Sequence, residues 1–196
     1  MADNRIKSAY ELAMEKIDKM GEASEDERRR WKLVPEGEKL AVKYFEDEAD
    51  LAAEFTKFKE EEKSYVAEGV QKVLLSRINL PKTDSATRDA EQALDGFAVI
   101  KEDKEGLHRL VDSIGGFFNH YYQHGEQQRQ EALANLKAQF GQQLQQSARE
   151  MGGSIGDVDP ETLPQFGEQK RRMLAHLDLQ YINHLDAYKK QLAELR

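Results

Sequence analysis

The sequence predicts an all-α protein, and three observations support this fold class. Only 4 of the 196 residues are proline and 13 are glycine, so few positions interrupt a helix. Several segments are rich in Ala, Glu, Lys, Leu and Gln, which lose little side-chain freedom in a helix. Charged residues make up 34% and the mean hydropathy is -0.80, as in long helices that each bury a narrow apolar stripe. We therefore expect an elongated helical bundle.

The first two expected helices are identified by their N-terminal residues. One begins at Asp3 or Asn4 as the N-cap and ends at Gly21, because apolar residues between them recur at steps of three and four. The sequence SEDE, from Ser24 to Glu27, then has the form of a capping box and predicts a short helix through Trp31. Pro35 is expected either to break the helix or to lie in the first turn of the next one.

From Glu36 to Asn79 the pattern stays helical, with a bend expected in the acidic patch 46–50. NLPKTDS at 79–85 predicts a turn, with Asp84 or Ser85 as the next N-cap. A helix over about residues 86–99 follows, and KEDKEG at 101–106 closes this part of the chain.

The longest helical pattern covers about residues 104–150. Glycines weaken it, so a kink at Gly115 and Gly116 or a break near Gly125 is expected. A loop near 151–160 follows, in which Asp159 and Pro160 predict the start of a last helix that runs to about residue 194. Two long helices joined by one short loop predict an antiparallel hairpin.

Charge divides the chain into two regions. Residues 1–105 contain 19 basic and 26 acidic side chains, a net charge of -7, whereas the remainder contains 10 and 11, a net charge of -1. All five histidines lie in the second region. We therefore expect an acidic N-terminal helical region over 1–103 and a long helical hairpin over 104–196.

Composition also excludes several functional classes. A net charge of -8 argues against nucleic-acid binding, because phosphate neutralisation supplies most non-specific affinity. The basic clusters at 27–32 and 169–172 each lie close to acidic residues, so we interpret them as solvated helix faces or helix ends, with contact to an anionic surface as the alternative. The chain has no cysteine and no apolar run long enough to span a bilayer. We expect a cytoplasmic protein that does not enter the membrane.

The stretch GGFFNHYYQH at 115–124 has two interpretations. Its four aromatic residues recur at steps of one, three and four, which places them on one face of a helix and indicates an apolar packing stripe. The alternative is a metal or small-ligand site in the hairpin. If the hairpin turns near residue 155, His124 lies level with Asp186, and His184 lies level with Glu126.

In that alternative, four residues are the candidate metal ligands: His120, His124, His184 and Asp186. Imidazole and carboxylate are ligands that zinc and iron accept. Against such a site, the histidine pair lacks the glutamate of an HExxH motif, and the sequence has a single Glu-x-x-His, at Glu105 and His108. We therefore expect no cofactor, and keep zinc or iron as the alternative.

Catalytic motifs give little indication of an enzyme. GGSIG at 152–156 has the Gly-x-Ser-x-Gly form, but it lies between two helices, whereas a nucleophile elbow follows a strand. The sequence therefore favours a non-enzymatic helical scaffold or interaction protein that acts through helix–helix association, as a homo-oligomer or with a protein partner. The alternative function is a helical bundle that binds a metal or small ligand through its histidine and tyrosine cluster.

Overall fold

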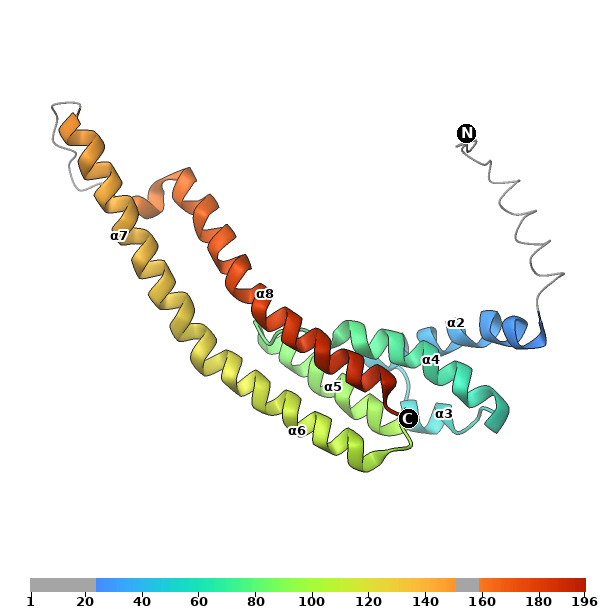
Figure 1. Ribbon diagram of the computed structural model, residues 1–196. Coiled ribbons are helices and arrows are strands. Elements are labelled where there is room, and N and C mark those ends of the chain that lie inside the picture. The colour runs from blue at the N-terminus through green and yellow to red at the C-terminus, as the bar shows by residue number, and fades with distance from the viewer. Residues whose placement is uncertain (1–23, 151–158) are drawn as a thin grey trace, which may run out of the picture. The chain divides into compact units, whose positions relative to one another are not determined.

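The computed structural model describes residues 24–150 and 159–196, and every regular element within these ranges is helical (Figure 1). The predicted all-α fold is therefore confirmed. The first expected helix, with Asp3 or Asn4 as its N-cap, and most of the expected loop at 151–160 lie outside the described residues.

The helices are α2 (Glu25–Phe45), α3 (Leu51–Phe55), α4 (Glu60–Arg77), α5 (Asp84–Ile100), α6 (Lys104–His120), the π-helix η1 (Tyr121–Gly125), α7 (Glu126–Glu150), the 3₁₀-helix η2 (Pro160–Thr162) and α8 (Pro164–Glu194). The described chain folds as two compact units. Unit 1 contains residues 24–76 and 95–100, and unit 2 contains residues 77–94, 101–150 and 159–196. The boundary expected after residue 103 was drawn from charge, and it stays a prediction.

The predicted capping box at the start of α2 is confirmed. The Glu27 amide donates to Ser24 Oγ at 3.2 Å, and the Ser24 amide donates to Glu27 Oε2 at 2.8 Å. The expected end near Trp31 is wrong, because α2 continues to Phe45 with Pro35 inside it. A proline within a helix removes one backbone hydrogen bond, so packing on both sides of Pro35 must stabilise this helix.

That packing is a close crossing of α2 and α4 in unit 1. A Cβ atom built on Gly37 would lie 2.1 Å from the Val66 carbonyl oxygen, and one built on Gly69 would lie 2.0 Å from the Val34 carbonyl oxygen. Both glycines are buried. The two backbones approach so closely because neither helix carries a side chain at the crossing.

The chain between α2 and α4 bends at the acidic patch 46–50, as expected. Helix α2 ends at Phe45, residues 46–48 form a turn and a bend, and Asp47 takes a left-handed conformation with φ 57°. The Asp50 side chain then accepts hydrogen bonds from the amides of Ala52 and Ala53 and caps the short helix α3. Asparagine and aspartate tolerate left-handed geometry and compete for backbone donors, so the acidic patch ends the helix.

The turn predicted at 79–85 is confirmed, but neither Asp84 nor Ser85 is the N-cap of the helix that follows it. Helix α5 begins at Asp84, and the Ala86 amide donates to Thr83 Oγ1 at 3.2 Å. A threonine hydroxyl one residue earlier therefore satisfies a free amide of the first turn.

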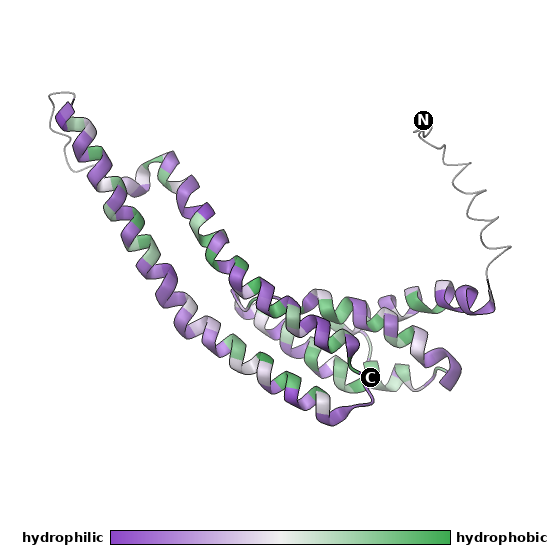
Figure 2. Cartoon of the chain, in the orientation of Figure 1, coloured by the Kyte–Doolittle hydropathy of each residue, from purple (hydrophilic) through white to green (hydrophobic). Residues whose placement is uncertain are grey.

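The predicted antiparallel hairpin forms in unit 2, from α6, η1 and α7 on one side and α8 on the other (Figure 1). Contacts along it pair rising with falling residue numbers: Phe117 with Tyr188, Gln128 with Tyr181, and Phe140 with Phe166. The predicted interruption near Gly125 is found as the π-helix η1, whereas the two adjacent glycines stay within α6. In Figure 2, hydrophobic and hydrophilic residues alternate along α7 and α8, as expected for helices with one buried stripe.

Hydrogen bonds fix the C-terminal end of α8 to the segment before α6. The buried Lys101 ammonium donates to the carbonyl oxygens of Leu195 at 2.6 Å and Ala193 at 3.4 Å. The Glu102 and Asp103 amides both donate to the Arg196 carbonyl oxygen. Cations stabilise a helix C-terminus, so this contact closes the hairpin. Within the described ranges, the helices are too short or too polar to cross a membrane.

We expect Gly69→Ala to lower the free energy of unfolding of unit 1 by about 2 kcal/mol or more, because the added methyl group meets backbone that cannot move aside. Chemical denaturation followed by the fluorescence of Trp31, the single tryptophan and a residue of α2, measures the change. Gly116→Ala is the matched control: its added methyl meets no atom within 4 Å. There the helix propensity of alanine should raise stability by up to about 1 kcal/mol, and an equal loss in both variants would contradict the crossing.

Candidate functional site

A π-helical turn lies within the stretch that combines aromatic and histidine residues. It is η1, with the sequence YYQHG, where Tyr121 and Gly125 are buried and the three residues between them are exposed. A π turn inserts one residue into a helix, and such turns occur frequently at functional sites. In this turn the Tyr121 side chain points toward α8, where its hydroxyl donates to Asp178.

Asp178 of α8 receives donors from three segments of unit 2. Its Oδ2 atom lies 2.5 Å from the Lys82 ammonium, and its Oδ1 atom accepts the Tyr121 hydroxyl at 3.2 Å. The Arg129 guanidinium lies 3.9 Å from the same Oδ1 atom. The Asp178 side chain is only 13% exposed. A largely buried carboxylate needs such donors, because loss of its hydration is costly.

Arg129 connects this carboxylate to the aromatic rings. Its guanidinium carbon lies 4.7 Å from the Tyr121 ring centroid, a cation–π contact. The same guanidinium donates to Glu126 Oε2 at 3.1 Å and 3.2 Å. Hydrogen bonds from Gln130 and Arg129 lower the pKa of Glu126. Burial, followed by the nearby charge of Asp178, raises the pKa of Tyr121 to about 12.

Next to this network, aromatic rings line the inside of the hairpin. The Phe117 ring centroid lies 6.0 Å from that of Tyr181 and 5.8 Å from that of Tyr188, and Tyr121 meets Tyr181 edge-on at 4.9 Å. Tyr122 departs from the expected common face: its side chain is 46% exposed, and its hydroxyl lies 3.0 Å from Thr87 Oγ1. The π turn changes the angle between successive residues, so the α-helical spacing misplaces Tyr122.

The structure brings three of the four predicted metal ligands into one neighbourhood. The rings of His120 and His124 lie 4.6 Å apart, and the His184 ring lies 6.4 Å from the Phe117 ring. All three histidines are exposed, as is Asp186. Within the described residues, no three histidine, aspartate or glutamate side chains lie where they could share a metal ion. The alternative zinc or iron site therefore stays a prediction.

The register of the hairpin agrees with the expected one at one point and departs from it at another. A turn near residue 155 places residue 128 level with 182, and the Tyr181 hydroxyl donates to Gln128. The same register places Tyr121 level with residue 189, whereas the Tyr121 hydroxyl donates to Asp178. The register depends on where the loop turns and on the residue added by the π turn, and neither follows from helical periodicity.

Sequence reasoning missed Lys82, Arg129 and Asp178, which hold the network together. One signal was available: Asp178 lies between two leucines, Leu177 and Leu179, of a predicted helix. An acidic residue in such a position needs a compensating donor. Only the tertiary structure identified those donors, which come from three other segments.

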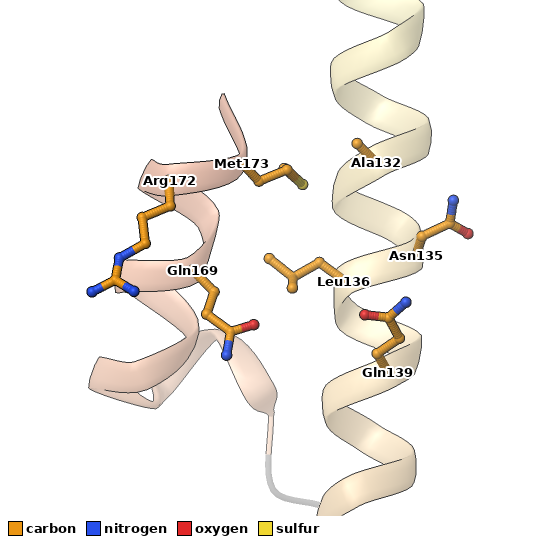
Figure 3. Close-up of a pocket in the computed structure, with 7 residues that line it drawn as sticks. All are labelled: Ala132, Asn135, Leu136, Gln139, Gln169, Arg172 and Met173. Carbon is orange, nitrogen blue, oxygen red and sulfur yellow. The ribbon is translucent and has the colours of Figure 1, made fainter. Parts of the chain in front are cut away.

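Two grooves open along the hairpin. The first, of about 620 Å³, lies beside the aromatic rings, and its lining residues are Phe117, His120, Gln128, Gln180, Tyr181, Asn183, His184 and Tyr188. The second, of about 530 Å³, lies between α7 and α8, where Leu136 and Met173 point toward each other and amide side chains flank them (Figure 3). Of these two grooves, the first adjoins the Asp178 network, because its lining residue Tyr181 packs against Tyr121.

Comparison with known proteins identifies one relationship. Residues 52–194 match a family of unknown function (DUF6657). No curated protein and no solved structure matches the chain. The matched range includes the whole hairpin from α6 to the end of α8, together with the Asp178 network.

We expect Asp178→Asn to lower the free energy of unfolding by about 2 kcal/mol, because it leaves the Lys82 and Arg129 cations without their largely buried counter-charge. Chemical denaturation followed by circular dichroism measures this loss. Asp186→Asn makes the same chemical change at an exposed position of the same helix, and should change stability by less than about 0.5 kcal/mol. Similar losses in the two variants would show that the network does not stabilise the hairpin.

The raised pKa of Tyr121 predicts a loss of stability in alkali. Between the usual tyrosine pKa of 10 and the folded value of about 12, the unfolded chain has released the proton and the folded chain still holds it, so stability falls as pH rises. Tyr121→Phe should therefore lose less stability than the wild type over this range, by up to about 2 kcal/mol. Ultraviolet titration of the tyrosinates checks the assignment: the most alkaline component should disappear in the variant, and its persistence would contradict it.

Proposed function

Because the chain belongs to the family of unknown function DUF6657, we propose from its structure that it is a non-enzymatic helical module that self-associates through α8. The observation that carries this proposal is an exposed apolar pair. Leu179 is 50% exposed and Ile182 is 40% exposed. They are three residues apart, so they lie on one face of the helix.

Burial of this pair would favour association. A fully buried leucine or isoleucine side chain contributes roughly 1.5–3 kcal/mol relative to an exposed one. Two residues alone do not make an interface, but they form the kind of central apolar anchor that a polar rim can surround. The amide and charged side chains on the remainder of α8 fit such a rim.

Contacts within the chain fix the position of the helix that carries the pair, without any binding partner. Asp178, the residue next to Leu179, is bound by Lys82 and Tyr121. Tyr181, the residue next to Ile182, is buried and packs edge-on against Tyr121. A preorganised surface loses less conformational entropy on binding, so more of the burial energy appears as affinity.

A second copy of the chain is the occupant that charge favours. Residues 106–196, which include α8, carry 10 basic and 11 acidic side chains, a net charge of -1. Two copies can therefore approach through this region with little electrostatic repulsion, whereas residues 1–105 carry a net charge of -7. Symmetric self-association through one patch is the commonest mode of assembly. A different protein partner is the other outcome that the experiment distinguishes.

We expect the double variant Leu179→Glu with Ile182→Glu to be monomeric at concentrations where the wild type is a dimer, because burying two carboxylates is unfavourable. Light scattering at several protein concentrations measures the mass, and circular dichroism shows whether helix content is kept.

Gln180→Glu with Asn183→Asp is the matched control. It adds the same two negative charges to exposed positions of the same two turns, and the dimer should persist. A wild type that remains monomeric at all concentrations would contradict self-association, and a dimer lost equally in both variants would show that net charge, not this face, controls it.

A further inference from the structure

The groove beside the aromatic rings has an unusual lining for this protein. Charged residues make up 34% of the chain, yet no aspartate, glutamate, lysine or arginine lines the groove. Aromatic rings and amide side chains take their place. The groove volume of about 620 Å³ lies in the range that accommodates small organic ligands.

Three aromatic side chains form one wall of the groove, and their rings lie at the distances usual for packed aromatic rings. Phe117 lies 5.8 Å from Tyr188 and 6.4 Å from His184, centroid to centroid, with the ring pairs tilted by 56° and 46°. Tilted and offset rings attract one another and a further flat ring through their quadrupoles. A planar ligand ring can therefore be held against this wall.

Tyr181 makes the floor of the groove rigid. It is buried, its hydroxyl donates to Gln128 Oε1 at 3.3 Å, and its ring packs edge-on against Tyr121. Tyr121 in turn donates to Asp178. The floor is thus connected to the charged network, while the network itself lies outside the lining residues.

Above this floor, the exposed side chains of Gln180 and Asn183 reach the groove from α8. Each amide provides both a donor and an acceptor. Paired donor and acceptor groups beside an aromatic wall match the edge of a heteroaromatic ring, which presents the same two kinds of group in its plane. The lining holds no lysine or arginine for a phosphate and no carboxylate for a cation.

From these observations we propose that the groove binds a planar, uncharged heteroaromatic ring of about the size of a purine base. The ring stacks against Phe117 and Tyr188, and its edge bonds to the amides of Gln180 and Asn183. This site is separate from the proposed association face, because Leu179 and Ile182 do not line the groove.

Adenine is the probe for the test, with cyclohexanone as a non-aromatic comparison, and saturation-transfer NMR on the full chain is the measurement. Adenine should bind saturably, with a Kd of about 1 mM or below, which is weak binding for a ligand of this size. Cyclohexanone should show no saturable binding. Adenosine monophosphate should bind no more tightly than adenine, because no lysine or arginine lines the groove to bind its phosphate.

Tyr188→Leu should weaken adenine binding at least about fivefold, since stacking of a base on an aromatic ring contributes directly to its affinity. Tyr122→Leu removes an exposed tyrosine outside the groove and should leave the affinity within about twofold. Circular dichroism checks both folds. If Tyr188→Leu does not fold, Asn183→Leu at an exposed position replaces it, with the same expected direction through loss of an edge hydrogen bond.

Two results would overturn the proposal. One is the absence of saturable adenine binding to the wild type up to roughly 10 mM, which corresponds to less than about 3 kcal/mol of binding free energy. The other is an affinity that the groove variant and the Tyr122 variant change equally. Neither result depends on whether the protein is a monomer or a dimer. A failure of self-association would therefore leave the groove proposal intact, and a failure of adenine binding would leave self-association intact.

Discussion

The Asp178 carboxylate is the constraint on which the organisation of the hairpin depends. It is largely buried, and its donors come from the segment before α5, from η1 and from α7. A buried charge without donors would cost several kcal/mol, so these three segments must stay close to α8 for the fold to be stable. The π turn belongs to the same constraint, because it places the Tyr121 hydroxyl on the carboxylate and the Tyr121 ring beneath the Arg129 guanidinium.

Unit 1 is held by a different kind of constraint, the exclusion of side chains. At the crossing of α2 and α4, Gly37 and Gly69 let each backbone approach the carbonyl oxygens of the other helix. Close packing of this sort gains dispersion energy over many atom pairs. The same packing helps the helix to continue through Pro35, because Leu33 and Val34 before the proline and Gly37 after it are buried.

Two surfaces of α8 follow from the same anchored turns. Asp178 and Tyr181 point inward, which leaves Leu179 and Ile182 exposed and places Gln180 and Asn183 at the groove. An apolar face and an amide-lined groove thus share a rigid support. We propose that the apolar face binds a second copy of the chain and that the groove binds a flat, uncharged ring.

The sequence by itself determined the helical class, the capping box at Ser24, the turn at 79–85 and the hairpin, because propensity, capping and apolar periodicity are local properties that each helix carries within its own residues. The tertiary structure alone decided the continuation of α2 past Pro35, the pairing of residues across the hairpin and the partners of Asp178. The roles of Lys82 and Arg129 were not predicted from the sequence. Their roles depend on contacts between segments that are distant in sequence. A shift of α8 by one helical turn relative to the other segments would change all of these contacts, and local sequence patterns do not determine that alignment.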